Sequence, residues 1–328
     1  MDVVQTVRGQ VSVDKLGFCL MHEHVLASAA GIPENYPQMY RSDWLQSLVS
    51  DLTSLKQNGV STIVDASPFD LGRDPKRLRM AAEAADINII CSSGFFFELN
   101  PCLGKWKEEQ IAQMQIDDLT KGIGDTGIRA GMIKAIMDQE GATPGRKFLH
   151  HAAGIASNET GVPVFLHSNP LFETGRYQIP LLREVGVDPA RIKLDHILET
   201  TNMDYIKWCY DQGVWLGCER IPRVVIPGDP YGVVVETRIK TAKAMIDAGM
   251  ADRMIFSHDF SGVTPVFDTL DAQQREIFDA QIPGRWLYLQ QSFFPKLVEL
   301  GVDPSVLQQT NVENPRKLFA GSHVGNVK

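Results

Sequence analysis

The sequence has few cysteines, no long apolar run and no excess of positive charge. The five cysteines are scattered and form no C-x-x-C pair, which disfavours a disulfide framework and a structural zinc knuckle. They are Cys19, Cys91, Cys102, Cys209 and Cys218. No stretch approaches 18 uncharged apolar residues, so no membrane span is expected. The formal net charge of −8 argues against binding to nucleic acid or to an anionic membrane surface.

The amino-terminal segment lacks the marks of a secretory signal. Met1-Asp2-Val3-Val4 contains no basic stretch and leads into no long apolar run. With the scattered cysteines, this predicts a cytoplasmic protein in a reducing compartment. The chain does have the composition of a globular protein, since 44% of its residues are hydrophobic and 22% are charged.

Eight short apolar runs rich in β-branched residues recur along the chain. They are Phe18–Val25, Ser61–Ser67, Asn88–Gly94, Ala130–Met137, Val162–Ser168, Arg191–Ile197, Val214–Glu219 and Arg253–Asp259. Each run is continuous rather than alternating in hydrophobicity, which is typical of parallel strands buried on both faces. Helical spacing follows several of them, in Leu45–Leu55, Leu78–Ala85, Ile111–Leu119, Phe148–Ala156 and Ile239–Ile246.

This alternation of strands and helices predicts an α/β fold of the (β/α)8 TIM-barrel class. Eight units in 328 residues leave about 41 residues for each, which suits a barrel with some long loops. Val4–Lys15 predicts a short N-terminal hairpin that turns near Gly9, and Pro304–Phe319 predicts one or two extra C-terminal helices. Phe260–Pro283 is expected to be a long loop. Because no linker divides the sequence, residues 1–328 are expected to form a single domain.

Polar residues gather at the ends of the predicted strands, where barrels place their active sites. Four of the eight histidines occur there with one lysine and one aspartate. These residues are His22, His24, Lys134, His167, His196 and Asp259. His22 and His24 are two apart on a strand, so their side chains share a face and can chelate a metal. Imidazole and carboxylate ligands without thiolate suit Zn²⁺, and tolerate Mn²⁺, Co²⁺ or Fe²⁺.

Lys134 lies within an apolar strand, where an unpaired ammonium group would be costly. Three explanations are open. The lysine could form a buried ion pair with a carboxylate, or act as a low-pKa amine that forms a Schiff base. It could instead be carboxylated by CO₂, which would make it an anionic ligand bridging two divalent cations. Beside four histidines, the third explanation fits best.

Asp259 ends the last predicted strand and has two interpretations. As a catalytic residue it would ligate a metal and accept a proton. As a structural residue it would cap the amino end of a helix, where aspartate is favoured. The preceding His258 would point to the opposite face, so a packing or supporting role is expected for it.

The order of these motifs resembles the phosphotriesterase family of the amidohydrolase superfamily, which includes phosphotriesterase-like lactonases. The resemblance covers nearly the whole chain. It rests on Met21–His24, Val64-Asp65, Leu71–Asp74, Asp125–Lys134, Gly161–Pro163 leading to His167, Asp195-His196, Ser257–Asp259 and Glu313–Arg316. It implies a binuclear metal site built by the four strand-end histidines, Asp259 and a carboxylated Lys134.

The resemblance also implies a hydrolase in which two metals lower the pKa of a bridging water and polarise a carbonyl or phosphoryl oxygen. Asp259 would carry the proton towards the leaving group. A small carboxylic ester or lactone is the expected substrate, with phosphotriester hydrolysis as a side activity. An amide hydrolase acting on N-acyl compounds is the main alternative. A Schiff-base lyase using Lys134 and a binding protein without catalytic activity are the two others. The resemblance also implies a homodimer, which is usual for the family.

Two further positions concern the substrate. Family members commonly have Tyr or Trp after the third strand, whereas this chain has Gly94-Phe95-Phe96-Phe97-Glu98. Phe97 and its neighbours could line an apolar substrate wall or simply pack. Arg220 matches an arginine of the lactonase-like branch, where it could hold a carboxylate or polar carbonyl tail of the substrate. The alternative for Arg220 is an exposed rim residue paired with Glu219.

Overall fold

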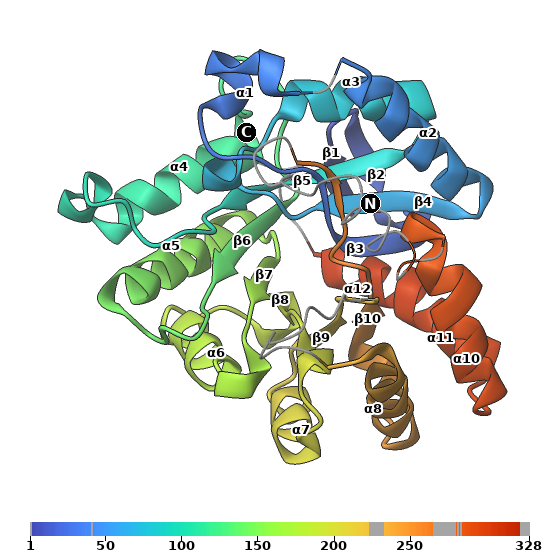
Figure 1. The fold of residues 1–328 in the computed structure, drawn as a ribbon. Helices are drawn as coiled ribbons and strands as arrows, with labels where there is room; N and C mark the ends of the chain where they lie inside the picture. Colours follow the sequence, from blue (N-terminus) through green and yellow to red (C-terminus); the bar gives the residue numbers. More distant parts are fainter. Residues whose placement is uncertain are drawn as a thin grey trace.

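Most strands of the chain pair in one curled parallel sheet (Figure 1). The computed structural model describes residues 2–40, 42–222, 233–264, 280, 282 and 284–321. Within these residues the sheet has nine strands in the order β10-β9-β8-β7-β6-β5-β4-β3-β11. They are β3 (Phe18–Leu26), β4 (Val60–Asp65), β5 (Asn88–Gly94), β6 (Met132–Ile136), β7 (Val164–His167), β8 (Ile192–Leu194), β9 (Trp215–Cys218), β10 (Met254–Phe256) and β11 (Ser261–Val263).

Each of the eight apolar runs in the sequence overlaps one strand of this sheet. Their continuous hydrophobicity reflects burial on both faces, because side chains alternate between the interior of the curled sheet and the surrounding helices. β11 was not expected, since the segment from Phe260 onward was predicted to be a loop. Ser261-Gly262-Val263 has no apolar run, and its pairing with β3 is made by the backbone, as in the 3.0 Å hydrogen bond from Ala27 N to Val263 O. Residues 265–279, 281 and 283 of that predicted loop lie outside the described residues.

The two edge strands of the sheet are neighbours in the sequence. β10 pairs with β9 at one edge and β11 pairs with β3 at the other, with only residues 257–260 between them. The connecting residues also bond to β3, since Asp259 N donates to His22 O at 3.0 Å and His24 N donates to Phe260 O at 2.8 Å. The end of the sheet therefore returns to its beginning, as in TIM-barrel-like folds.

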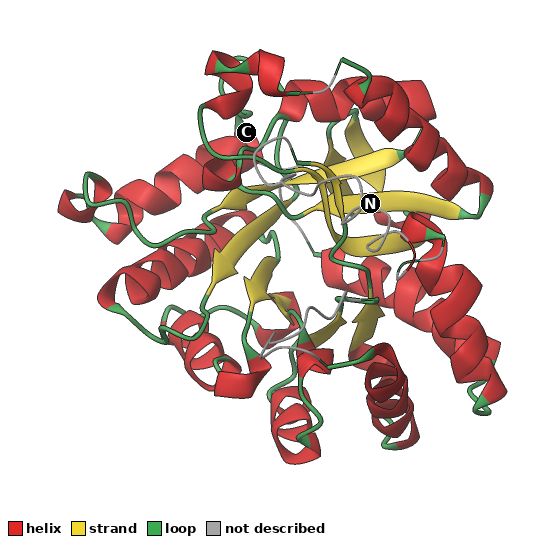
Figure 2. Ribbon diagram, viewed as in Figure 1, coloured by secondary structure: helices red, strands yellow, loops and turns green. Residues whose placement is uncertain are grey.

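Helices cover the outer side of the sheet (Figure 2). They are α2 (Trp44–Gln57), α3 (Pro75–Ala85), α4 (Glu108–Thr120), α5 (Pro144–Thr160), α6 (Gly175–Glu184), α7 (Met203–Asp211) and α8 (Val235–Asp247), with the short α1 (Ile32–Asn35) after β3. The five predicted helical stretches lie in α2, α3, α4, α5 and α8. α6 and α7 had not been predicted, and α6 contains the helix breaker Pro180. Among the described residues, no helix is both long and apolar enough to span a bilayer.

The two ends of the chain close the interior of the sheet from the side of the strand amino ends. The predicted N-terminal hairpin is confirmed as β1 (Val3–Thr6) and β2 (Gly9–Ser12), which pair antiparallel. The C-terminal part contains α10 (Phe294–Glu299), α11 (Pro304–Gln308) and α12 (Asn314–Phe319). Both ends pack on an apolar interior layer. Its strand residues are Cys19, Met21, Val64, Ile90, Met132, Phe165, Trp215 and Ile255, covered by Val4, Val13, Leu16, Leu318 and Phe319.

Candidate metal centre

The structure brings the six predicted site residues to one end of the curled sheet. His22 and His24 lie in β3, Lys134 in β6, and His167 is the last residue of β7. His196 and Asp259 follow β8 and β10. All six lie where the carboxyl ends of parallel strands meet, above the apolar interior layer.

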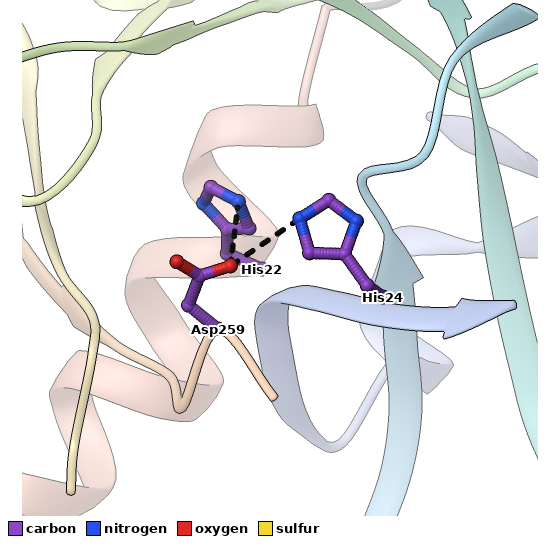
Figure 3. Close-up of side chains that lie close together, drawn as sticks. All are labelled: His22, His24 and Asp259. Atoms are coloured by element: carbon purple, nitrogen blue, oxygen red, sulfur yellow. Dashed lines mark ion pairs between the residues drawn. The ribbon is translucent and has the colours of Figure 1, made fainter. Parts of the chain in front are cut away.

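One group of ligand atoms is formed by two histidines and the aspartate (Figure 3). Asp259 Oδ1 lies 3.3 Å from His24 Nε2 and 3.5 Å from His22 Nε2. The two rings point toward the same carboxylate, with centroids 5.6 Å apart. Two imidazole nitrogens and one carboxylate oxygen facing each other could hold a divalent cation.

A second group lies beside the first. His167 Nδ1 is 3.0 Å from His196 Nε2, so two ring nitrogens from neighbouring strands converge. Lys134 Nζ is 3.2 Å from His22 Nε2, which places the lysine next to the first group. The distance between the ring centroids of His22 and His196 is 4.9 Å. The two groups therefore adjoin, as a two-metal site requires.

The other nitrogen of each of these rings faces an oxygen, which is the usual arrangement around metal-binding histidines. His24 Nδ1 is hydrogen-bonded to Ser67 Oγ at 2.9 Å, and His22 Nδ1 lies 3.0 Å from Asp195 Oδ2. The corresponding distances are 3.6 Å from His196 Nδ1 to Glu219 Oε2 and 3.8 Å from His167 Nε2 to Asp138 Oδ2. Of these four contacts, only that of His24 is a hydrogen bond within the described residues, since His22 Nδ1 and His196 Nδ1 have no hydrogen-bond partner and the His167 contact is too long. A proton on each outer nitrogen would face these oxygens and leave the converging nitrogens as lone-pair donors. The residues present thus fit divalent metals.

Burial keeps three of the histidines neutral. Desolvation, reinforced by the charge of Lys134, lowers the pKa of His22 to about 3. Burial also lowers the pKa of His167, and it holds the pKa of His196 well below its usual range. Neutral imidazole is the form that binds metals, so these rings are suited to coordination at ordinary pH.

Asp259 is held in an unusual backbone conformation. Its φ of 57° lies in the left-handed region, which costs energy for a residue other than glycine. Burial would raise the pKa of this carboxyl, but His22, His24 and Arg220 together hold it well below its usual range. Asp259 is therefore a carboxylate in contact with both histidines of β3. The alternative of a helix cap does not apply, because the short strand β11 follows at Ser261.

Lys134 forms the buried ion pair that was one of its three predicted explanations. Its side chain is inaccessible to solvent, and Nζ donates to Asp195 Oδ2 at 2.8 Å. Asp195 holds its negative charge because Lys134 and Lys193 outweigh the effect of burial and keep its pKa well below the ordinary value.

Arg220 contacts the site, but its partners differ from the one considered in the sequence. Its Nε donates to Asp259 Oδ2 at 2.9 Å, and Nη1 donates to Glu199 Oε2 at 2.6 Å. The alternative pairing with Glu219 is wrong, because Glu219 binds Lys193 and the backbone N–H of His196. Arg220 has a φ of 60°, and this turn directs its side chain towards Asp259.

The phenylalanines after β5 occupy different environments. The Phe96 ring lies edge-on to His167 with centroids 5.6 Å apart, whereas the Phe97 side chain is 46% exposed and packs on Phe96. Asp70 accepts the backbone N–H groups of both residues and fixes this segment. Phe97 was the predicted substrate contact, but Phe96 is the phenylalanine that touches a site histidine.

Five buried charged residues of the site had not been predicted: Glu23, Lys193, Asp195, Glu199 and Glu219. Glu23 accepts hydrogen bonds from Ser257 Oγ, His258 N and Phe260 N, and thereby holds the segment that carries Asp259. Glu23, Asp195 and Glu219 are adjacent in the sequence to residues that were singled out. The signal in the sequence is a charged residue inside or beside an apolar strand, a feature that they share with Lys134.

Comparison with known proteins places this site in context. A family model, the Phosphotriesterase family, matches residues 2–319. The chain is 30% identical to a "Phosphotriesterase homology protein" of Mycobacterium tuberculosis (strain ATCC 25618 / H37Rv), with 97% of this chain and 98% of that protein covered. It is 31% identical to "Aryldialkylphosphatase" of Saccharolobus solfataricus, with 93% of this chain and 95% of that protein covered. It is 22% identical to "N-acetyltaurine hydrolase" of Homo sapiens, with 96% of this chain and 97% of that protein covered.

Proposed function

The chain belongs to the phosphotriesterase family of hydrolases, and on this premise we propose that it is a binuclear metal-dependent hydrolase of a small carboxylic ester or lactone. The observation that carries the proposal is that His22 Nε2 and His24 Nε2 face Asp259, with Lys134 beside His22, and that a second pair of ring nitrogens, His167 Nδ1 and His196 Nε2, meets next to this group. In this proposal the curled sheet is a closed (β/α)8 barrel, and residues 1–328 form one domain.

Two divalent metals, when bound, would supply an activated water and polarise the substrate oxygen. Zn²⁺ suits the donor set best, and Mn²⁺, Co²⁺ or Fe²⁺ would be tolerated. His22, His24 and Asp259 would hold one metal, and His167 and His196 the other. Carboxylated Lys134 would contribute to both. Carboxylation requires Lys134 to leave Asp195 and lose one proton to become an amine; the amine nitrogen then bonds to the carbon of CO₂ and releases a second proton, which gives the carbamate anion.

The residues of the chain would position the substrate and move the proton. Asp259 lies in contact with His22 and His24, and its second oxygen is held by Arg220, so it is placed to accept a proton and pass it to the leaving group. Phe96 and Phe97 would form an apolar wall beside His167.

The surroundings of Arg220 favour an uncharged substrate. This guanidinium is already paired with two carboxylates, those of Asp259 and Glu199. Glu199 also lies 3.5 Å from Arg238 Nη2, so within the described residues two arginines and two carboxylates balance each other, and a carboxylate of the substrate would find both guanidinium groups already paired. A neutral carbonyl group, as in an ester or lactone, could still accept a hydrogen bond from it.

Two other substrate classes are supported by names among the relatives. The similarity to an aryldialkylphosphatase supports phosphotriester hydrolysis as a side activity, because both reactions place negative charge on an oxygen near a metal. The similarity to N-acetyltaurine hydrolases supports the alternative of an amide hydrolase acting on N-acyl compounds. A small molecule is thus the expected partner. The homodimer and the cytoplasmic location stay predictions.

A substrate panel tests this proposal. The metal-loaded enzyme is assayed with matched lactones, aryl esters, N-acyl amino compounds and phosphotriesters, and kcat/KM is compared. We expect the neutral esters or lactones to give the highest value. A much larger kcat/KM for an N-acyl compound would favour the amide hydrolase. Activity that survives metal removal, together with borohydride trapping of a carbonyl substrate on Lys134, would favour the Schiff-base lyase.

A further inference from the structure

A lysine occupies a position in the interior layer where the neighbouring strands have large apolar residues. Lys193 of β8 is in register with Phe165 of β7 and Trp215 of β9, and both neighbours belong to the apolar layer. The Lys193 side chain is fully buried, with Nζ 4.9 Å from the centroid of the Phe165 ring. A buried ammonium group is costly unless it is well paired, so packing alone does not account for a lysine here.

The ammonium group is paired with two carboxylates directly beneath the candidate metal centre. Lys193 Nζ donates to Asp195 Oδ1 at 2.6 Å and to Glu219 Oε1. Burial would lower the pKa of Lys193, but these carboxylates raise it above its ordinary value. A Cβ atom at Gly217 would lie 2.3 Å from Glu219 Oε1 and 2.8 Å from Lys193 Nζ. The absence of a side chain at Gly217 in β9 therefore makes room for the paired side chains of Lys193 and Glu219.

The remaining oxygens of the two carboxylates face metal-binding candidates. Asp195 Oδ2 lies 3.0 Å from His22 Nδ1 and 2.8 Å from Lys134 Nζ. Glu219 Oε2 accepts the backbone N–H of His196 at 2.6 Å and lies 3.6 Å from His196 Nδ1. Each carboxylate thus has one oxygen on Lys193, while the other faces the Nδ1 atom of a site histidine, and neither Nδ1 has a hydrogen-bond partner among the described residues.

We propose that Lys193 is a positioning residue of the metal centre, which holds Asp195 and Glu219 so that His22 and His196 present their Nε2 atoms to the metals. This inference rests on the proposed function, since it concerns the same site. Lys193 touches neither the substrate nor the converging nitrogens. It acts through Asp195 and Glu219, which face the Nδ1 atoms of His22 and His196, on the side of each ring away from the metals.

The charges of the cluster give Lys193 a second role. Lys134 and Lys193 together balance Asp195 and Glu219 as long as Lys134 is an ammonium group. Carboxylation would turn Lys134 into an anion and remove it as the partner of Asp195. Lys193 would then be the remaining lysine on both carboxylates, so it matters most in the metal-loaded enzyme.

Metal binding tests the inference more directly than activity. Lys193→Met is compared with wild type by Co²⁺ titration, followed through the visible absorption of the bound ion, and by Zn²⁺ competition with a chromophoric chelator. We expect metal affinity to fall by about 10- to 100-fold, the loss typical of partners behind metal ligands, and the Co²⁺ spectrum to change. In a double-mutant cycle, Lys193→Met should lower Co²⁺ affinity less in the Glu219→Gln background than in wild type, because Lys193 acts partly through that carboxylate.

A matched control separates positioning from general stability. Arg73 is also a buried cation paired with a carboxylate, Asp118, but it lies outside the sheet before α3. Arg73→Met should lower the melting temperature and leave the Co²⁺ spectrum and affinity unchanged. If Lys193→Met does not fold, Lys193→Gln is measured instead, because its amide can still donate to a carboxylate, and we expect weaker metal binding than in wild type.

The outcomes distinguish this inference from the proposed function. If wild type binds two metals while the folded Lys193 variant matches it in affinity and spectrum, Lys193 has no positioning role. A loss of affinity on Lys193→Met that is as large in the Glu219→Gln background as in wild type would equally overturn the inference, since Lys193 would not act through Glu219. If wild type itself binds no metal in the presence of bicarbonate, the proposed function fails first.

Discussion

Glu23 and His258 are joined by two contacts to one carboxylate oxygen. Glu23 Oε1 accepts the backbone N–H of His258 at 2.9 Å and lies 3.0 Å from the ring Nδ1 of the same residue. The second oxygen, Oε2, accepts the N–H of Phe260 at 2.8 Å. The residue between the two histidines of β3 therefore fixes both neighbours of Asp259.

Glu23→Gln should impair catalysis without abolishing the fold. An amide can accept fewer of these N–H groups than a carboxylate, and its NH₂ group would face donors. We expect kcat/KM to fall by about 10- to 100-fold, as for other residues that position metal ligands. Steady-state kinetics and thermal melting measure this, with the exposed Glu109→Gln as a control. Wild-type kinetics in Glu23→Gln would show that Asp259 is positioned by the backbone alone.

Asp259→Asn should remove the proton acceptor and one ligand while preserving the volume of the side chain. We expect kcat to fall by about 10²- to 10⁴-fold, the usual contribution of a general acid or base. Thermal melting of the variant shows whether the fold is retained. A variant that binds metal normally and keeps most of its kcat would rule out a catalytic role for Asp259.

Metal removal should reduce both activity and stability. Ligands that bind only the native state stabilise it, by about 2.7 kcal/mol at a concentration 100 times the Kd. We therefore expect dialysis against a chelator to lower the melting temperature and abolish hydrolysis. Zn²⁺, Mn²⁺ or Co²⁺ should restore both, and restoration should be faster with added bicarbonate if Lys134 is carboxylated. Full activity after verified metal removal would contradict the proposed chemistry.

Phe96 should contribute more to substrate turnover than Phe97. The Phe96 ring contacts His167, while that of Phe97 is partly exposed. Aromatic contacts are worth about 1 kcal/mol, so we expect Phe96→Ala to lower kcat/KM by about 3- to 10-fold. Phe97→Ala is the matched comparison and should have a smaller effect. An equal or larger loss in Phe97→Ala would place the apolar wall on Phe97, as the sequence suggested.

His150 should make the protein less stable in mild acid. It is fully buried on α5, where Nδ1 donates to Arg146 O at 2.7 Å, and burial lowers its pKa to about 4. In the unfolded chain its pKa is about 6.5, so unfolding takes up a proton between these values. Stability is thus lost as the pH falls from about 6.5 to 4, by on the order of 3 kcal/mol.

Chemical denaturation at pH 8 and pH 4.5 tests the contribution of His150. In His150→Gln, the difference in unfolding free energy between the two pH values should be smaller than in wild type. The comparison at pH 8 controls for any direct effect of the substitution on packing. An unchanged difference would mean that other groups dominate the acid sensitivity.

Much of the fold follows from the local pattern of the sequence. Each of the eight apolar runs overlaps a strand because parallel strands buried on both faces need continuous hydrophobicity. The helices α2, α3, α4, α5 and α8 carry clear apolar stripes. β11 has no such pattern, since Ser261 and Val263 pair with β3 only because the sheet curls back on itself. α6 was missed because Pro180 interrupts its sequence.

The alternation of side chains in β3 shows the limit of strand periodicity. Cys19 and Met21 pack in the interior apolar layer, yet His22 and His24, one residue out of phase, face the site. The pairing of β3 with β4 shifts register between Leu20 and Glu23. The spacing of His22 and His24 predicted their shared face, but it could not predict the irregularity that turns that face inward.

By itself, the sequence determined which residue types stand at the strand ends, and so which residues could converge as metal ligands. The tertiary structure alone decided their partners: Glu199 and Asp259 for Arg220, Asp195 for Lys134, and two carboxylates for the buried Lys193. The physical reason is that buried charges must be neutralised by neighbours in space. Those neighbours come from strands far apart in the chain, which no local pattern records.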